Sequence, residues 1–428
     1  MAQSGKHGYA HKTVFYSNNK QNEAKMKLLS QKHGIYKNLS GETIFNSQAA
    51  ILIFITGIAF KLSAAPGMIN EEFGSSTFWV FVCYSLIDVV LTALVFLFAR
   101  KNGDALLEAT DSLAYRVLSF VAMLFFSLKG LFQFAYAASY LTHELFEGLE
   151  PSLIYLLFLL PIVYLGVKGI RTIARTGEVF FFVLAATIIV NLAFLNTKMD
   201  FARILPVFSK EPSTLATAFP RYGLWLGDML PFVFVKIKDK RLPYITASVI
   251  GTWLVVCVVI LLGVAIYGDA LKTVTDLLIR MAGFNQLSKD IGRTEWSNLL
   301  VVIISSIISL SFTYFGATSA CKRAFKTDLP IKVIYPLAVA LAIFIIPSAQ
   351  TVTDFATRDF GYVMFALALE LPIALACLCL FKQQKYPHLQ KLLNEEYVKK
   401  SDDFDFANSS DTALLDGFKQ LPSNSAKV

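Results

Sequence analysis

Long apolar segments follow one another along most of this chain, and they limit its fold more than any other feature. A helix that crosses a bilayer needs about 20 mostly apolar residues, because every backbone polar group must be satisfied inside the segment. The composition agrees: 55% of the residues are hydrophobic and only 16% are charged, which is too apolar for a soluble domain. We therefore predict an all-α polytopic membrane protein.

The apolar segments divide into ten predicted transmembrane helices. These spans cover residues 48–69, 77–99, 117–141, 152–167, 177–195, 223–235, 244–268, 299–317, 331–346 and 361–381. The first span follows a polar stretch that does not resemble a signal peptide, so we expect it to direct insertion. Three regions follow from this division. They are a polar N-terminal segment (1–46), a ten-helix transmembrane domain (47–382) and a polar tail with too little apolar surface to fold alone (383–428).

Lysine and arginine residues determine the predicted orientation, because short cytoplasmic loops carry an excess of them. With the N-terminus inside, the cytoplasmic loops contain Arg100, Lys101, Arg116, Lys168, Arg171, Arg175, Lys236, Lys238, Lys240, Arg241, Lys322, Arg323, Lys326 and Lys332. The short loops on the other side, 70–76 and 142–151, contain glutamates but neither Lys nor Arg. Both termini are therefore predicted to be cytoplasmic. The net charge of +8 is spread over these loops, which argues against a nucleic-acid partner.

Sequence patterns of enzymes and metal sites are missing from the predicted spans. All five His residues lie outside them, and they contain no Gly-rich phosphate loop and no closely spaced pair of carboxylates. The five Cys residues match neither a zinc site nor a disulfide framework. We expect no enzymatic activity, no cofactor and no metal ion.

Two spans differ from the rest, and each opens one half of the chain. Span one contains Gly57, Lys61, Ser63 and the run 64–67 with its proline, and span six contains Gly223, Gly227, Asp228 and Pro231. Discontinuous helices at matching positions are typical of transporters built as a 5+5 inverted repeat, whose ligand site lies where both helices unwind. The alternative is that these glycines and prolines only allow close packing or a kink.

Ionisable residues within the spans are candidates for function, because they are costly in hydrocarbon. They are Lys61, Asp88, Lys129, Glu178, Asp228 and Glu370. A lysine there could hold a carboxylate, occupy a cation site or exchange a proton. The alternative is a structural pair of a lysine with an acid, for example Lys129 with Asp228 or Glu370, and for Asp88 and Glu370 we favour this structural role.

Hydroxyl and aromatic side chains add weaker candidates. Ser305 begins a group of hydroxyl residues in span eight that could contact a ligand or an ion, or could bond back to the helix. In span three, Gln133, Tyr136 and Tyr140 could line a small amphipathic ligand near Lys129, or could be ordinary packing residues. Residues 270–287 show helical spacing of apolar residues and predict an amphipathic external helix.

Several short patterns between residues 40 and 382 resemble one family. They are Ser47-Gln48 at the start of span one, Ala174-Arg175-Thr176-Gly177-Glu178 before span five, Arg203 to Phe208, Leu226-Gly227-Asp228 in span six, and Thr275 to Met281 followed by Arg293 to Trp296. Together they resemble the spore germination permease family, the B subunits of nutrient germinant receptors in the amino acid-polyamine-organocation superfamily. The resemblance implies a fold of the leucine-transporter type and a small nutrient ligand, an amino acid, near Gly57, Ser63, Gly227 and Asp228.

The hypothesis from the sequence is a permease-like protein that binds an amino acid in spore germination, as a receptor subunit or a transporter. Its predicted partners are the ligand, the lipid bilayer, further receptor subunits and a coupling proton or sodium ion, and its predicted location is the cell membrane, including the spore inner membrane. The alternative is an ordinary proton- or sodium-coupled amino acid transporter with no role in germination. The predicted substrate-binding residues are Gly57, Lys61, Ser63, Lys129, Tyr136, Gly227, Asp228 and Ser305.

Overall fold

A computed structural model describes residues 43–108, 113–142, 150–195, 199–205, 211–237, 242–274, 276–283, 295–345 and 360–385. The chain divides into two compact units, Met1–Ala376 and Cys377–Val428. Everything described below belongs to the first unit, apart from the last residues of the final helix. Nearly all of the two predicted polar tails lies outside the described residues, so their roles stay predictions.

Helices account for almost all of the described chain. The α-helices are α2 (Asn46–Ala59), α3 (Ala64–Phe73), α4 (Thr77–Glu108), α5 (Leu113–Tyr140), α6 (Pro151–Lys168), α7 (Ile170–Ala193), α8 (Pro212–Ala218), α9 (Leu242–Tyr267), α10 (Leu277–Ala282), α12 (Glu295–Phe325), α13 (Leu329–Ile345) and α15 (Gly361–Lys385). Short 3-10 helices are η2 (Gly74–Ser76), η4 (Phe201–Ile204), η5 (Phe219–Trp225), η6 (Leu230–Phe234) and η7 (Gly268–Thr273). Two-residue strands β1 (Thr43–Ile44) and β2 (Lys236–Ile237) pair in parallel.

Five helical stretches of the described chain are long and apolar enough to cross a membrane. They are Ala65–Phe96, Leu113–Ala138, Ile170–Ala193, Pro243–Thr273 and Ser297–Phe325. Shorter apolar helices occupy Asn46–Ala59, Ser152–Lys168 and Gly361–Ala374. The predicted α-helical, multi-pass membrane architecture is confirmed, while the count of ten spans and the inverted repeat stay predictions.

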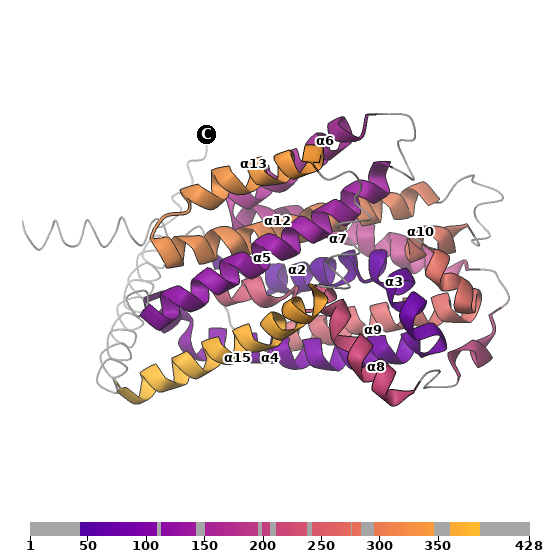
Figure 1. Ribbon diagram of the computed structural model, residues 1–428, viewed down its shortest axis with the longest axis horizontal. Helices are drawn as coiled ribbons and strands as arrows, with labels where there is room; N and C mark the ends of the chain where they lie inside the picture. The colour runs from indigo at the N-terminus through magenta and orange to yellow at the C-terminus, as the bar shows by residue number, and fades with distance from the viewer. Residues whose placement is uncertain are drawn as a thin grey trace, which may run out of the picture. The chain divides into compact units, whose positions relative to one another are not determined.

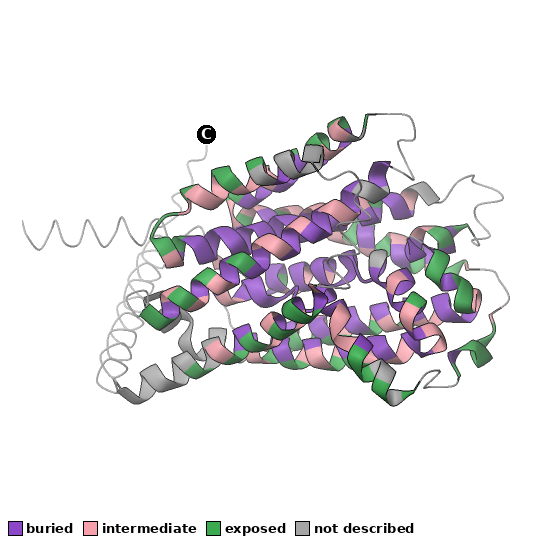
Figure 2. Ribbon diagram, in the orientation of Figure 1, coloured by how far each residue is buried: buried purple, intermediate pink, exposed green. Residues whose placement is uncertain are grey.

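Helices α2 and α12 form the centre of the bundle (Figure 1). α12 packs against α5, α6, α7 and α2, and α2 also packs against α9 and α7. In the apolar stretch of α12, 78% of the residues are buried, against 22% in α7. Figure 2 shows the same contrast between the buried centre and the outer helices. Because α7 exposes Phe182 and Val179 at 74% and 70%, its outer face suits contact with lipid chains.

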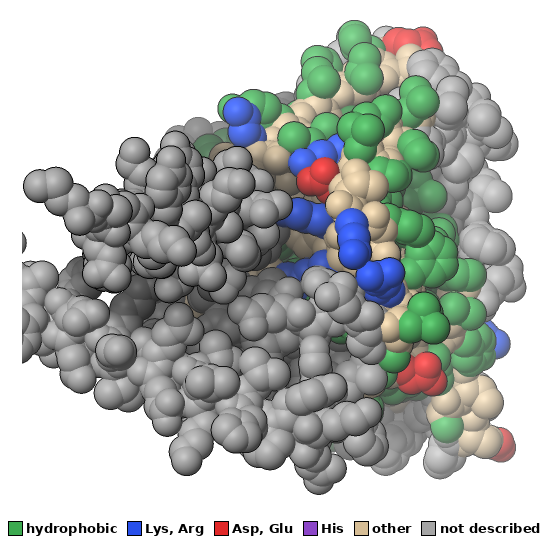
Figure 3. Space-filling model, turned by 90° about the vertical axis from the view of Figure 1, so that its left-hand side faces the viewer, with side chains coloured by type: hydrophobic (Ala, Val, Ile, Leu, Met, Phe, Trp, Pro, Cys, Tyr) green, Lys and Arg blue, Asp and Glu red, His purple; other side chains and the backbone are tan. Residues whose placement is uncertain are grey.

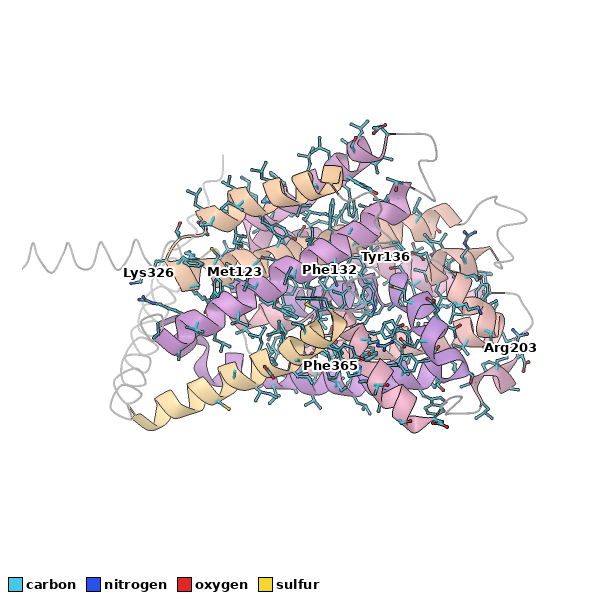
Figure 4. The ribbon with its side chains drawn as sticks, in the orientation of Figure 1. Met123, Phe132, Tyr136, Arg203, Lys326 and Phe365 are labelled. Carbon is cyan, nitrogen blue, oxygen red and sulfur yellow. The ribbon has the colours of Figure 1, made fainter. Side chains whose placement is uncertain are left out.

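Basic side chains gather at one end of the bundle. Figure 3 shows Lys and Arg side chains on the face where Lys326, labelled in Figure 4, follows α12, and Arg203 lies at the opposite end. Lys322 and Arg323 lie in the last turn of α12, and Lys168 in the last turn of α6. This clustering fits the loop charges used for the orientation, which itself stays a prediction.

Several segments differ from the sequence-based boundaries, and α4 and α12 continue to Glu108 and Phe325, past the predicted ends at 99 and 317. Span five was predicted from Gly177, but α7 begins at Ile170, because Gly169 with φ +91° separates it from α6 and the helix continues through Arg171 and Arg175. The predicted external helix 270–287 is divided into η7 and α10, since the side chain of Asp276 caps the N-terminus of α10. Its apolar residues, including Leu271 and Leu277, are buried against the bundle as expected for an amphipathic segment.

Candidate functional site

The first predicted discontinuity is present between α2 and α3. α2 ends at Ala59, residues 60–63 form a turn, and α3 begins at Ala64. Pro66 lies in the first turn of α3, where its missing N–H is tolerated, but it could not continue a helix begun before Lys61 without losing a bond to the carbonyl of Leu62. The break leaves the side chains of Lys61 and Ser63 almost fully buried, both at 2% exposure.

The second discontinuity lies between η5 and η6. Leu226 is extended, and Gly227 has φ +76°, which an L-residue rarely adopts. η6 then begins at Leu230 with Pro231 in its first turn. The predicted span 223–235 is therefore two short 3-10 helices on either side of a turn that carries Asp228.

Four buried charges join the two breaks. Lys61 Nζ lies 2.6 Å from Asp228 Oδ2 and 3.4 Å from Asp88 Oδ2, and Lys129 Nζ lies 2.8 Å from Asp228 Oδ1. The four residues are between 1% and 7% exposed. Two lysines face two aspartates, so the charge cluster formed by Lys61, Asp88, Lys129 and Asp228 is electrically balanced. Balance of this kind is what allows charges to remain buried in a membrane protein.

The charge cluster also satisfies backbone groups that the second break leaves without helical partners. The Gly227 N–H donates to Asp88 Oδ1 at 3.2 Å, and the Lys129 ammonium donates to the carbonyl of Leu226. Lys61 Nζ lies 4.8 Å above the ring centroid of Trp253 on α9, a cation–π contact. The turn between η5 and η6 is therefore held in place by side chains of α4, α5 and the first break.

The alternative of structural lysine–acid pairs is partly realised. Lys129 pairs with Asp228 as that alternative suggested, and Asp88 pairs with Lys61. Glu370 does not take part, because its side chain is exposed on α15. Glu178, at the beginning of the predicted span five, accepts a hydrogen bond from Gln48 on α2 at 3.1 Å.

A small cavity lies beside the first break. It is lined by Phe60, Ser63, Tyr136, Ala137, Leu141, Phe158, Asp276, Val302, Ile303 and Ser306. The ring of Trp225 borders this region, with ring centroids 6.2 Å from Phe60 and 6.3 Å from Tyr136. Tyr136 lies on α5 one turn beyond Phe132, in the middle of the bundle (Figure 4). The lining is mostly apolar with few polar groups, as in sites for small ligands, but the cavity has a volume of about 10 Å³ in this conformation, which is room for about one water molecule.

The eight predicted site residues fall into three groups. Lys61, Lys129, Gly227 and Asp228 meet in or beside the charge cluster, and Ser63 and Tyr136 line the cavity. Gly57 and Ser305 lie elsewhere. A Cβ atom on Gly57 would lie 2.5 Å from Thr252 on α9, so this glycine allows close helix packing. Ser305 donates back to the carbonyl of Val302 at 3.2 Å, as do Ser311 and Thr313 to preceding carbonyls.

Sequence reasoning missed one polar residue of the cavity, Asp276, and it included Ser306 only as one of the hydroxyl residues of span eight. Asp276 is 1% exposed and its Oδ1 accepts from the N–H of Ile279. The sequence did contain a signal for a helix start at this residue, because an Asp directly before two leucines is a helix N-cap pattern. Ser306 is also buried, and its hydroxyl has no hydrogen-bond partner among the residues that the structure describes. Among the described residues, no three His, Cys, Asp or Glu side chains lie close enough to hold a metal ion.

Side chains of α3, η5 and α15 form a second polar cluster. We call it the latch and define it as Glu72, Arg221, Tyr222 and Tyr362. Arg221 Nη1 donates to Glu72 Oε1 at 2.6 Å, and the Tyr222 hydroxyl donates to Glu72 Oε2 at 3.0 Å. Arg221 Nε donates to the Tyr362 hydroxyl at 3.0 Å. The latch therefore connects α3, the second half of the first discontinuous span, to η5, the first half of the other, and η5 in turn to α15.

We expect Arg221→Gln to make the cavity more accessible to reagents from outside the bundle, because α3 and η5 are then held together less firmly. Glu72 and Arg221 are 25% and 38% exposed, so the pair contributes at most about 1 kcal/mol, and its loss shifts an opening equilibrium by about two- to fivefold. The measurement is the labelling rate of Ala137→Cys, a cavity position, by a membrane-impermeant thiol reagent after the native cysteines are replaced by serine. Arg203→Gln, which removes an exposed charge on η4, is the control, and equal rates in both variants would contradict a latch.

A multi-pass helical bundle with two broken spans that meet at buried charges defines a membrane permease-type protein. The sequence model of the family described as "spore germination protein" matches residues 43–353, more than half of the 428 residues. This chain therefore belongs to the spore germination protein family, as its motifs predicted. The family and the fold are those of permeases and not of enzymes, so the predicted lack of enzymatic activity is confirmed.

Solved structures show the same fold. The crystal structure of MhsT in complex with L-phenylalanine has a TM-score of 0.50 and 13% sequence identity, and the match covers 77% of this chain and 98% of that chain. At this identity the likeness establishes the fold alone, which is the leucine-transporter type. No curated protein sequence matches the chain.

Proposed function

We propose that this protein binds a small nutrient, an amino acid, and acts in spore germination as a germinant-receptor subunit or transporter. One observation carries the proposal: in a chain of the spore germination protein family, two broken spans meet at a buried charge cluster, and a small, mostly apolar cavity lies beside the first of them. The likeness to a fold whose solved example holds L-phenylalanine supports an amino acid as the ligand. The same site suits the alternative, an ordinary coupled amino acid transporter.

The proposal includes the finer topology. The chain crosses the membrane ten times as two five-helix halves in inverted repeat, with both termini in the cytoplasm. The five long apolar stretches, the three shorter ones and the basic residues at one end of the bundle support this arrangement. In a sporulating cell the location is the spore inner membrane.

Within the cavity, the ligand's charged groups need partners that the charge cluster does not supply. Asp228 already faces two ammonium groups, so we assign the ligand's ammonium to Asp276, the acid that lines the cavity. Ser63 precedes α3 and also lines the cavity, so the positive end of the α3 dipole is positioned for the ligand's carboxylate. The ligand's side chain then lies among Phe60, Tyr136 and Phe158, and these residues must move apart to admit it, because the cavity has a volume of only about 10 Å³.

The charge cluster bears on the coupling ion. A sodium ion is bound by carboxylate oxygens or by the carbonyl oxygens of unwound helices, and here both carboxylates, those of Asp88 and Asp228, already face Lys61 and Lys129. The ammonium groups of Lys61 and Lys129 thus lie where a bound cation would contact these two carboxylates. If the protein transports its ligand, this arrangement favours a proton over sodium as the coupling ion.

A thermal-shift screen of the detergent-purified protein against single amino acids tests the proposal. Because a ligand that binds only the folded state stabilises it by RT ln(1 + [L]/Kd), we expect about 2.7 kcal/mol at 100 times Kd. One or a few amino acids should raise the melting temperature. No shift with any of the common amino acids would overturn the proposal, and uptake into vesicles separates a transporter from a receptor.

Asp276→Asn tests the assigned ammonium contact. Asn is as good an N-cap as Asp, so we expect α10 to remain folded while the amino acid shift falls strongly at the same ligand concentration. Asp269→Asn is the matched control, because Asp269 is exposed on η7 and the same charge is removed. A full shift in Asp276→Asn would place the ligand's ammonium elsewhere.

A further inference from the structure

The two faces of α15 have different surroundings. One face packs on the second broken span: a Cβ atom on Gly223 would lie 2.4 Å from the backbone N of Phe365, and one on Gly227 would lie 3.4 Å from Ala368 Cβ. The Phe365 ring lies 5.9 Å from that of Phe219 on η5, and Figure 4 shows where Phe365 lies on α15. The bound face of α15 is therefore in direct contact with the turn that carries the charge cluster.

The opposite face of α15 is exposed and contains one acid. We call it the Glu370 face, defined by Val363, Ala366, Glu370 and Ile373. These positions are three or four residues apart, so they form one stripe along the helix. Val363 and Ile373 are 43% and 49% exposed, and Glu370 makes no hydrogen bond or ion pair with the rest of the described chain.

The position of Glu370 along the helix places it deep in the bilayer. α15 begins at Gly361, and at 1.5 Å per residue Glu370 lies about 14 Å further along the helix. The hydrocarbon layer is about 30 Å thick, so in the proposed ten-span topology, in which α15 crosses the membrane from Gly361, the carboxyl group lies near its middle. Ionisable residues at this depth almost always face a protein interior, a water-filled cavity or a partner.

We propose that the Glu370 face binds a transmembrane helix of another membrane protein, and that this helix presents a lysine, an arginine or another hydrogen-bond donor to Glu370. We choose a helix with a cation or other donor as the binding partner because it complements the charge of Glu370. The lysines of the charge cluster already face Asp88 and Asp228, so they do not serve Glu370. Ala366, one turn away, is small enough for a second helix to approach closely.

A second copy of this chain is a poor occupant of the same face. A second copy that packs along the same face brings another acid and no cation to Glu370, and two carboxylates close together repel each other unless one of them takes up a proton. A foreign helix that carries a donor avoids this repulsion. The other face of α15 contacts Gly223 and Gly227. The helix α15 alone would therefore separate such a partner from the turn between η5 and η6 that carries Asp228.

The first experiment uses two synthetic transmembrane peptides and the full-length protein in lipid vesicles. Both peptides are leucine-rich helices of equal length, and one has a central lysine where the other has leucine. We expect the lysine peptide to associate about tenfold more strongly, measured by energy transfer to labelled protein, as for one interhelical hydrogen bond. Glu370→Gln and Glu370→Leu should reduce this preference, whereas Asp328→Asn, beyond the end of α12, should not.

The outcomes of this experiment distinguish between a foreign helix and a second copy of the chain as the partner that binds the Glu370 face. Equal association of the two peptides, or an unchanged lysine preference in both Glu370 variants, would overturn the proposal. Energy transfer between two labelled copies of the protein that disappears in Glu370→Leu would assign the face to a dimer and also overturn it. Because Glu370 is outside the cavity, both variants should keep the amino acid thermal shift, so this test is independent of the proposed ligand site.

A second experiment tests the native partner in the membrane of the producing cell. A photo-crosslinking amino acid at Ala366 should capture a membrane protein that the same residue at Phe182, on the exposed face of α7, does not. Glu370→Lys should abolish the cross-link. Replacement of the partner's Lys or Arg by Glu should then restore it, because the two charges are again opposite. Failure of every such charge exchange in the captured helix would contradict a contact with Glu370.

Discussion

Asp228→Asn is expected to destabilise the protein by about 3–5 kcal/mol, the usual cost of removing one partner from a buried ion pair. Asp228 faces Lys61 at 2.6 Å and Lys129 at 2.8 Å, so its loss leaves two buried ammonium groups with one carboxylate, Asp88. Ligand binding should also disappear, because the turn between η5 and η6 is held by the same contacts. Unfolding and amino acid thermal shift, measured side by side, check both expectations.

A second substitution distinguishes charge imbalance from a simple loss of contacts. In Asp228→Asn combined with Lys129→Met, Lys61 and Asp88 remain as a balanced pair, so we expect much of the stability to return. Strong non-additivity of this kind is expected only for residues that interact directly. Asp269→Asn, at an exposed position, should change stability little. If the double variant were as unstable as the sum of the single variants, charge balance would not be what stabilises the cluster.

The membrane architecture could be predicted because hydropathy and helix length are local properties. The predicted spans 117–141 and 152–167 correspond closely to α5 and α6, since a bilayer demands uninterrupted apolar helices. The breaks at residues 60–63 and 226–229 were also visible, because glycine and proline act on their own backbone. The start of α7 was placed too late, because charged residues can extend a helix beyond the hydrocarbon and hydropathy does not show its continuation.

The site could be predicted only in part, because its contacts join distant segments. Lys61, Lys129 and Asp228 were identified one by one, since a charge within an apolar span is unusual. Their mutual pairing depends on packing, as Lys61 and Asp228 are 167 residues apart in the chain. Asp276 was missed for the opposite reason: acids are ordinary in external segments, and only the folding of η7 and α10 onto the bundle brings this one to the cavity.

Gly227→Leu is expected to abolish ligand binding and to destabilise the fold by two separate effects. With φ +76°, any L-residue at this position is strained, at a cost of about 1–3 kcal/mol. The new side chain must also enter a filled space, since even its Cβ would lie 2.9 Å from Leu230 Cδ1 and 3.4 Å from Ala368 Cβ. Overpacking of this kind costs a further amount of about 1–3 kcal/mol.

Gly251→Leu provides the matched control, because nothing lies within 4 Å of a Cβ atom at this position of α9. The same atoms are added to a regular helix, so stability should change by no more than about 0.5 kcal/mol. Normal ligand binding in Gly227→Leu would remove the turn between η5 and η6 from the site. Loss of binding confined to Gly227→Leu would instead show that this turn, which donates its N–H to Asp88 and packs on α15, must keep its conformation and its packing for the ligand to bind.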